Sequence, residues 1–349
     1  MTVSDLTKQA IDAVGTNASS DWLLQPEQHA KSLPDHAGPL KRILEQESLK
    51  GIISRFKKAD VSAVRQQVRY KRAGRVGIWT RFISILIGAA FIFPFENLFA
   101  DWAGPSLPFG LEFTQAAFLL QLFLLGLAFL TAQWLAYFRP FDKWMEARAK
   151  AEIARIDLFN NVLDSNEASR PGELPVLPLQ LEYFRRYLLD METSYYKGRG
   201  EEHSKAAGRS KLWMLVRNLL IAAAALTLLY GLAAIFGIFP WIDELSRKGF
   251  IASATVASAI YGVMYDISLM DMNERNAARY RSTFDNLVYL RNAGLDQARK
   301  LAANGHKNGV RHFSRLVNDQ ISSEHREWVA LKDLMPKLNQ SLLNFESAT

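Results

Sequence analysis

The chain alternates between long apolar stretches and long charged stretches. Four runs contain no charged residue, and they cover positions 82–95, 113–138, 218–242 and 249–265. A helix that crosses the hydrocarbon core needs about 20 mostly apolar residues, so the second and third runs are long enough by themselves. The first and fourth reach that length by including polar residues at their ends, such as Arg81 and Asp266. The pattern predicts an all-α integral membrane protein with four transmembrane helices.

Lysine and arginine are distributed unevenly around these runs. Segments 1–81 and 139–217 carry 14 each, and segment 271–349 carries 12. The stretch 96–112 has three acids and no base, and the stretch after the third run balances two acids with two bases. Because short cytoplasmic loops are enriched in Lys and Arg, we expect both termini and the middle segment in the cytoplasm. This predicts a multi-pass protein of the cell inner membrane, with the lipid bilayer as a partner.

Composition excludes several classes of function. The chain has no cysteine, so disulfides and thiolate metal sites are ruled out. Its six histidines are scattered and none belongs to a metalloprotease pattern, so we expect no enzyme, no cofactor and no metal. The net charge of +7 is concentrated where a helix would enter the membrane, with nine bases in 55–81 against one acid. Such a block attracts anionic lipid headgroups, and we do not expect nucleic acid as a partner.

The same plan is used twice along the chain. Each half has a basic lead-in, two apolar runs joined by a short turn, and a charged extension with helical periodicity. A proline-rich stretch separates the halves. We therefore expect two transmembrane hairpins, divided as follows: a polar, weakly ordered N-terminal arm (1–44), a first membrane unit (45–170), a linker (171–180), a second membrane unit (181–340) and a tail (341–349).

The extensions carry apolar residues every three or four positions, which is typical of amphipathic helices. One predicted stripe is Met145, Ala149, Ile153, Ile156, Phe159 and Leu163. Two others are Tyr280, Phe284, Leu287 and Leu295, and then Phe313, Leu316, Val317, Ile321, Trp328 and Leu331. Two explanations are open. The stripes pack on each other as a cytoplasmic helical bundle, or part of their surface joins subunits or docks a partner protein.

Asp266 is the most informative side chain in the apolar runs, because ionisable residues in membrane helices usually face a bundle interior or a water-filled path. Thr255, Ser258 and Gly262 precede it at helical spacing, so one stripe of the fourth helix is narrow and polar. Small residues allow close helix packing, with Asp266 reaching the headgroups. Alternatively, the stripe lines an oligomeric pore with Asp266 at its inner mouth.

Gln121 and Gln133 in the second run lie on roughly the same side of their predicted helix, twelve residues apart. An amide in lipid needs a hydrogen-bond partner. We expect an interhelical hydrogen bond of about 1 kcal/mol, with a wet conduit as the alternative.

Two sparse motifs resemble a known family. Trp144, Arg148, Glu152 and Arg155 follow the second run, and Tyr280 is followed much later by Glu324, Glu327 and Trp328. These residues are similar to the signatures of SLATT domains, the SMODS and SLOG-associating two-transmembrane effectors, here as a tandem pair over about 45–335. The resemblance implies a prokaryotic inner-membrane effector that forms pores when a nucleotide-signalled sensor is triggered, in antiviral defence.

Two functions therefore stay open. The first is a homo-oligomeric, pore-forming or membrane-perturbing effector in a nucleotide-signalled defence or cell-suicide system, with a nucleotide-sensing or synthase protein as partner. The second is a non-conducting membrane scaffold or sensor that recruits a partner through its cytoplasmic helices. A small-solute transporter fits less well, because transporter sites favour several polar groups at the membrane midplane.

Overall fold

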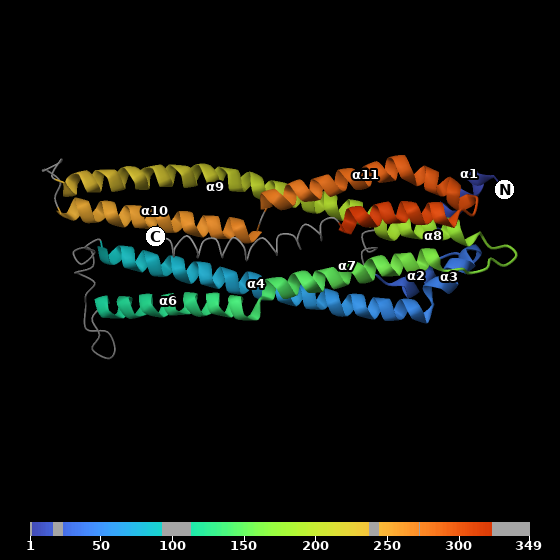
Figure 1. Ribbon diagram of the computed structural model, residues 1–349, viewed down its shortest axis with the longest axis horizontal. Coiled ribbons are helices and arrows are strands. Elements are labelled where there is room, and N and C mark those ends of the chain that lie inside the picture. The colour runs from blue at the N-terminus through green and yellow to red at the C-terminus, as the bar shows by residue number, and fades with distance from the viewer. Residues whose placement is uncertain (1, 17–23, 93–112, 237–243, 272, 323–349) are drawn as a thin grey trace, which may run out of the picture. The chain divides into compact units, whose positions relative to one another are not determined.

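The computed structural model describes residues 2–16, 24–92, 113–236, 244–271 and 273–322, and every regular element within these ranges is a helix (Figure 1). The all-α prediction is therefore confirmed. The elements are α1 (Val3–Val14), α2 (Pro26–Ser32), η1 (Asp35–Ala37), α3 (Gly38–Leu44), α4 (Glu47–Ile92), α6 (Phe113–Phe138), α7 (Pro140–Asp164), α8 (Val176–Phe184), the π-helical η2 (Arg185–Asp190), α9 (Met191–Ile235), α10 (Glu244–Asp271) and α11 (Asn273–Ala303). Residues 307–322 are also helical.

The chain divides into two compact units, and the division does not follow the predicted hairpins. Unit 1 comprises 1–66, 141–203 and 275–349, and unit 2 comprises 67–140 and 204–274. Each of the two predicted membrane units contributes to both. The apolar runs gather in unit 2 and the charged extensions gather in unit 1, so composition rather than order along the chain separates the units.

Unit 1 has a well-packed hydrophobic core. Its largest fully buried side chains come from α3, α4, α7, α8 and α9: Tyr183, Tyr196, Phe159, Phe184, Leu40, Ile43, Leu44, Leu49, Leu158, Leu163, Leu179 and Leu181. Leu287, Val310 and Val317 join the same core and are 0% exposed. Burying a side chain of this size stabilises a fold by about 1.5–3 kcal/mol, so unit 1 is held together in the manner of a soluble helical domain.

The weakly ordered N-terminal arm is a wrong prediction for residues 2–16 and 24–44, and 17–23 lie outside the described residues. Helix α1 begins with a capping box in which Thr2 and Asp5 exchange hydrogen bonds of 3.1 Å, and it packs on α8. The prediction took the prolines of this segment as signs of irregular structure, but Pro26 and Pro39 lie in the first turns of α2 and α3. Proline is favoured there because its missing N–H has no helical acceptor.

The linker prediction also needs correction. Helix α8 begins at Val176, so the non-helical segment is 165–175 rather than 171–180. This segment is tied to α3, because Arg42 donates hydrogen bonds of 2.6 Å to Glu167 and 2.8 Å to Glu173. The hydrogen bond from Arg42, together with one from the backbone N–H of Arg170, lowers the pKa of the Glu173 carboxyl to about 2. The segment is therefore attached to α3 by hydrogen bonds and is part of unit 1.

The predicted stripes are partly right. In α11 Leu287 and Leu295 are buried, and in 307–322 Phe313, Val317 and Ile321 are buried, as predicted. In α7, Met145, Phe159 and Leu163 are buried as predicted, whereas Ile153 is 58% exposed. Ala147, Ala151, Ala154, Leu158 and Val162 of the same helix are buried as well. Leu316 is also exposed, at 40%. Trp328 and Leu331 lie outside the described residues. The buried face of α7 is thus wider than the predicted stripe, and Ile153 lies outside it.

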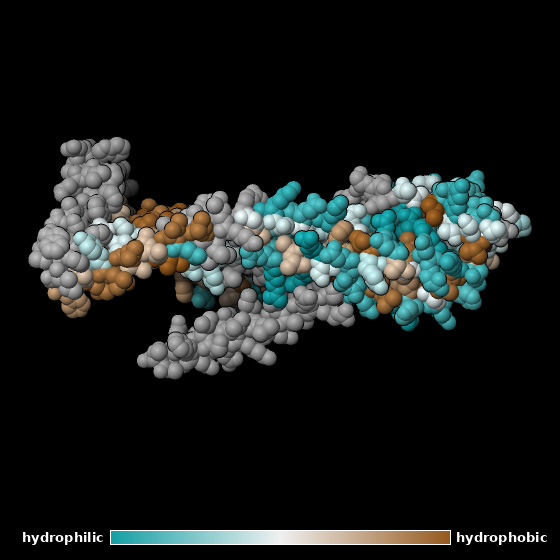
Figure 2. All heavy atoms as spheres, turned by 90° about the horizontal axis from the view of Figure 1, so that it is seen from above, coloured by the Kyte–Doolittle hydropathy of each residue, from teal (hydrophilic) through white to brown (hydrophobic). Residues whose placement is uncertain are grey.

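Unit 2 reverses this pattern of burial. Two helices in the described ranges are long and apolar enough to cross a membrane, Glu47–Ala90 and Gln115–Asp164, and Ile221–Ala233 is a shorter apolar helix. Only 17% and 0% of the apolar windows of the two long helices are buried in the protein. Phe123, Leu226 and Phe236 are 66%, 67% and 78% exposed. Figure 2 shows hydrophobic surface over unit 2 and largely hydrophilic surface over unit 1. An outward apolar surface of this kind indicates membrane association.

Candidate functional site

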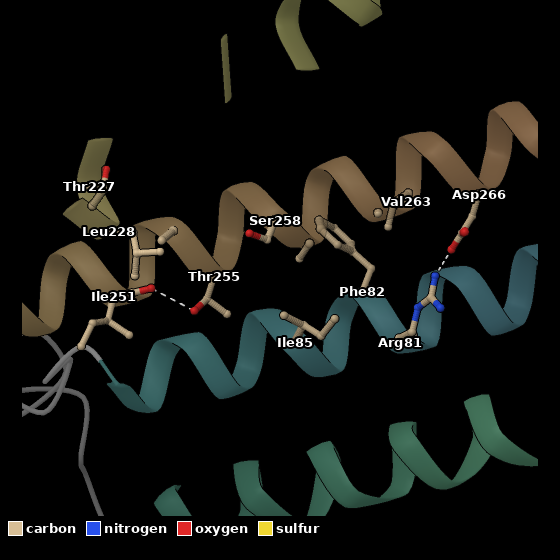
Figure 3. A pocket seen from close by; sticks show the side chains of 13 residues that line it. Arg81, Phe82, Ile85, Thr227, Leu228, Ile251, Thr255, Ser258, Val263 and Asp266 are labelled. Atoms are coloured by element: carbon tan, nitrogen blue, oxygen red, sulfur yellow. Dashed lines mark hydrogen bonds and ion pairs between the residues drawn. The ribbon is translucent and has the colours of Figure 1, made fainter. Parts of the chain in front are cut away.

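Unit 2 contains a hollow of about 720 Å³ between α4, α9 and α10 (Figure 3). All four residues of the predicted polar stripe, Thr255, Ser258, Gly262 and Asp266, line it. The other lining residues are Arg81, Phe82 and Ile85 of α4, Thr227 and Leu228 of α9, and Ile251, Ala254, Ala259 and Val263 of α10. The hollow is therefore apolar along most of its wall and charged at the end where Arg81 and Asp266 lie.

The stripe on α10 borders open space rather than a tight helix contact. A Cβ added to Gly262 would meet nothing within 4 Å, and Ser258 is exposed. The Thr255 hydroxyl donates to the carbonyl of Ile251 at 2.9 Å, which satisfies it within its own helix. The buried face of α10 is the neighbouring one, with Ala259 and Val263. Close packing through Gly262 is thus not a feature of unit 2.

Close packing of small residues occurs instead between α4 and α6. A Cβ on Gly88 would lie 2.7 Å from Nε2 of Gln121, and one on Gly77 would lie 3.3 Å from Cγ2 of Thr131. The hydroxyl of Ser84, which is 1% exposed, donates to the backbone carbonyl of Gln121 at 3.4 Å. The Gln121 side chain therefore packs against α4, whereas Gln133 is exposed. This seam holds the first hairpin together.

Asp266 forms an ion pair with Arg81, and Figure 3 shows the two side chains pointing toward each other across the end of the hollow. The two side chains are 29% and 48% exposed. The carboxylate is therefore neither an isolated headgroup-facing acid nor a free attractor of cations. Removing one partner of such a pair in a poorly hydrated setting leaves the other charge uncompensated, which is costly. The pair joins α4 to α10.

One of the family-like motif residues, Arg155, connects two helices of unit 1. Arg155 binds Glu152 of its own helix at 2.5 Å and is also ion-paired with Glu192 of α9. Burial raises the pKa of Glu192, whose side chain is 5% exposed, and the nearby Glu152 carboxylate raises it further, while the charge on Arg155 opposes both effects. The arrangement is a buried charged bridge between α7 and α9.

The other motif residues differ in their surroundings. The ring of Tyr280 lies 5.7 Å from that of Tyr196, and Trp144 packs edge-on against Phe141 at 5.9 Å. Arg148 is exposed. Glu324, Glu327 and Trp328 lie outside the described residues. Tyr280 and Arg155 therefore both contact α9 within unit 1.

Two features escaped the sequence interpretation. The partner of Asp266 was not foreseen, although Arg81 stands at the end of the first apolar run as Asp266 stands at the end of the fourth. A buried charged network around Arg185 was also missed, because its acids and bases interrupt an otherwise apolar segment without a regular period. Among the described residues, no group of three His, Asp or Glu side chains is arranged to hold a metal ion.

No protein-family model, curated protein or solved structure matches this chain. The SLATT resemblance therefore rests on the motif residues alone. What the site contributes by itself is a partly polar hollow, closed at one end by an ion pair, inside helices whose outer surface is apolar.

Proposed function

We propose that the protein is an oligomeric inner-membrane effector that lets ions leak along the α10 hollow, in a nucleotide-signalled defence or cell-suicide system. The observation that carries the proposal is the position of a hollow bearing hydroxyl groups and an ion pair inside helices whose outer side chains are apolar. The defence role and a nucleotide-sensing or synthase partner follow from the SLATT resemblance.

The proposal includes four membrane spans. Helix α10 has 28 residues, and at 1.5 Å per residue its length of about 42 Å exceeds the hydrocarbon core. Its mean hydropathy is reduced by the polar residues of the stripe, and this is expected of a helix that faces water on one side. The excess of Lys and Arg in 1–81, 139–217 and 271–349 supports cytoplasmic termini and a cytoplasmic unit 1.

In this proposal the Arg81–Asp266 pair acts as the gate. The pair lies at the charged end of the hollow, and its two charges cancel, so a passing cation meets no strong binding site there. Separation of the pair exposes a carboxylate toward the hollow. Rings of such carboxylates favour cations when several copies of a chain assemble around one axis.

Induced expression in bacteria with a membrane-potential dye tests the proposal. We expect wild-type protein to depolarise the cells, and Arg81→Gln or Asp266→Asn to change the leak at least severalfold. Arg75→Gln is the matched control, because Arg75 is an exposed arginine of the same helix that does not line the hollow. An unchanged potential with wild-type protein, even when neighbouring sensor genes are active, contradicts the leak. Equal leaks in the wild-type protein and all three variants would show that ions do not pass through the hollow.

A second candidate is a non-conducting scaffold or sensor that recruits a protein through unit 1. It is favoured by exposed apolar side chains on the unit 1 helices, since Tyr289 of α11 and Ile153 of α7 are 70% and 58% exposed. It predicts co-purification of one partner at fixed stoichiometry, loss of that partner in Tyr289→Ser, and no conductance in reconstituted bilayers.

A further inference from the structure

Unit 1 has a small surface hollow lined largely by arginine. Its volume is about 280 Å³, and it is lined by Arg185, Arg291, Asn292, Leu295, Asp296 and Arg299. Three of these six side chains are permanently cationic, and Asp296, whose side chain is 80% exposed, is the one acid among them. The lining itself thus carries three cations and one acid, and the buried Glu182 and Asp190 behind it balance the other two charges.

Two buried acids that do not line the hollow, Glu182 and Asp190, form ion pairs with these arginines. Arg185 donates to Glu182 at 2.5 Å and to Asp190 at 2.7 Å, and Glu182 also accepts from Arg299 at 2.7 Å. The Glu182 and Asp190 side chains are 2% and 7% exposed. These acids fix the guanidinium groups in place, as supporting residues do around a binding site.

The π-helical winding of η2 makes this arrangement possible. In an α-helix, side chains three or four residues apart are neighbours, so residue five lies on a different face. In η2 the wider turn brings residue five beside residue zero, and Arg185 reaches Asp190 in that way. With Glu182 three residues before it, Arg185 is bound from both sides. Single π-turns of this kind are frequent at functional sites.

The three guanidinium groups retain unused donors. Each guanidinium has five N–H groups. Arg185 makes three hydrogen bonds, to Glu182, Asp190 and the carbonyl of Gly15. Arg299 also makes three, to Glu182 and Asp296. Within the described residues, Arg291 has an ion pair with Asp190 at 3.4 Å, and its side chain is 48% exposed. The Arg185 and Arg299 side chains are 7% and 20% exposed, so Arg291 is the most accessible donor to an acceptor in the hollow.

We propose that this hollow binds a phosphoryl dianion, either as inorganic phosphate or as the phosphate monoester end of a larger molecule. A phosphoryl group offers several acceptor oxygens to fork-shaped donors, and arginine is the preferred residue for this recognition. The volume of about 280 Å³ suits a group of that size and excludes a drug-sized ligand. The proposal concerns unit 1 alone and does not depend on ion leak through unit 2.

The test is calorimetric titration of the full chain in mild detergent at low ionic strength, with inorganic phosphate as probe and chloride as reference. We expect saturable binding of phosphate to wild-type protein. Arg291→Gln should weaken it about tenfold or more, as expected for loss of a charge-assisted contact. Arg281→Gln is the matched control, since Arg281 is an exposed residue of the same helix outside the hollow. The affinity of this variant for phosphate should equal that of the wild-type protein.

Asp296→Asn provides an opposite change. Because it removes the one acid on the wall, it should tighten phosphate binding severalfold, which a purely structural ion-pair network would not do. Glycerol 3-phosphate, and phosphatidylcholine vesicles with and without phosphatidic acid, then distinguish a soluble monoester from a lipid headgroup. The proposal is overturned if phosphate does not bind saturably, if chloride at equal ionic strength has the same effect, or if Arg281→Gln weakens binding as much as Arg291→Gln.

Discussion

The two units of this protein bury opposite kinds of side chain. In unit 1 large aromatic and aliphatic residues such as Tyr183 and Phe159 are inside, and most charges are outside or in paired networks. In unit 2 comparable residues such as Phe123 are exposed, while Ser84 and Ala89 lie inside. The hydrophobic effect explains unit 1. It does not explain unit 2 in water. An apolar solvent around unit 2 would account for the difference, because helices in lipid associate through small residues and hydrogen bonds.

The first prediction compares two phenylalanines. Phe159→Ala should lower the free energy of unfolding of unit 1 by about 3–5 kcal/mol, because a fully buried ring leaves a cavity. Phe123→Ala, at a position 66% exposed, should cost less than about 0.5 kcal/mol in detergent. Hydrogen exchange in micelles measures the two units separately. Equal losses at the two positions would remove the contrast between the units.

The second prediction concerns the charged bridge of unit 1. Arg155→Met leaves Glu192 buried and unpaired, and we expect a loss of about 3 kcal/mol. The control is Arg199→Met, whose ion pair with Glu202 is exposed and worth less than about 1 kcal/mol. The double change Arg155→Met with Glu192→Leu should recover part of the loss, as measured by denaturant titration. Failure to recover would mean that Arg155 acts by packing alone.

The third prediction asks which solvent covers the exposed apolar residues. The chain has no cysteine, so a single substitution introduces a unique thiol. Leu226→Cys in unit 2 and Tyr289→Cys in unit 1 are matched in exposure, at 67% and 70%. In lipid vesicles a water-soluble maleimide should label position 226 at least about tenfold more slowly, because the thiolate does not form in hydrocarbon. Equal rates would place both side chains in water.

The smallest expected effect is a dependence on pH within unit 1. Because Arg42 lowers the pKa of Glu173 to about 2, the stabilisation that this carboxylate provides is fully present above its ordinary value of 4.5. It is lost as the pH falls from there toward 2. Glu173→Gln should flatten the thermal-unfolding midpoint over this range, and Glu45→Gln, at an exposed glutamate, should leave the midpoint profile unchanged.

Much of the helical arrangement was predictable, because apolar runs and three-to-four spacing are local properties. Spacing alone predicted the buried stripe of α11 around Leu287. It also predicted that Thr255, Ser258, Gly262 and Asp266 share one face of α10. Other features depend on contacts between distant segments. The packing of residues 2–16 and 24–44 requires α8, and the pairing of Asp266 requires α4. Nothing near Arg185 in the sequence indicates a π-helix, and the contact of Glu182 with Arg299 joins residues 117 positions apart.

The π-turn of η2 holds one residue more than the α-turn it replaces, because its backbone hydrogen bonds span five residues instead of four. Removal of a single residue between Arg185 and Asp190 would restore regular winding and keep the helices on either side nearly in phase, so Glu192 and Tyr196 would still face Arg155 and Tyr280. The same deletion in a regular helix such as α7 would rotate every following side chain by about 100°. The chain can therefore lose one residue in η2 with less disturbance of the unit 1 core than in α7.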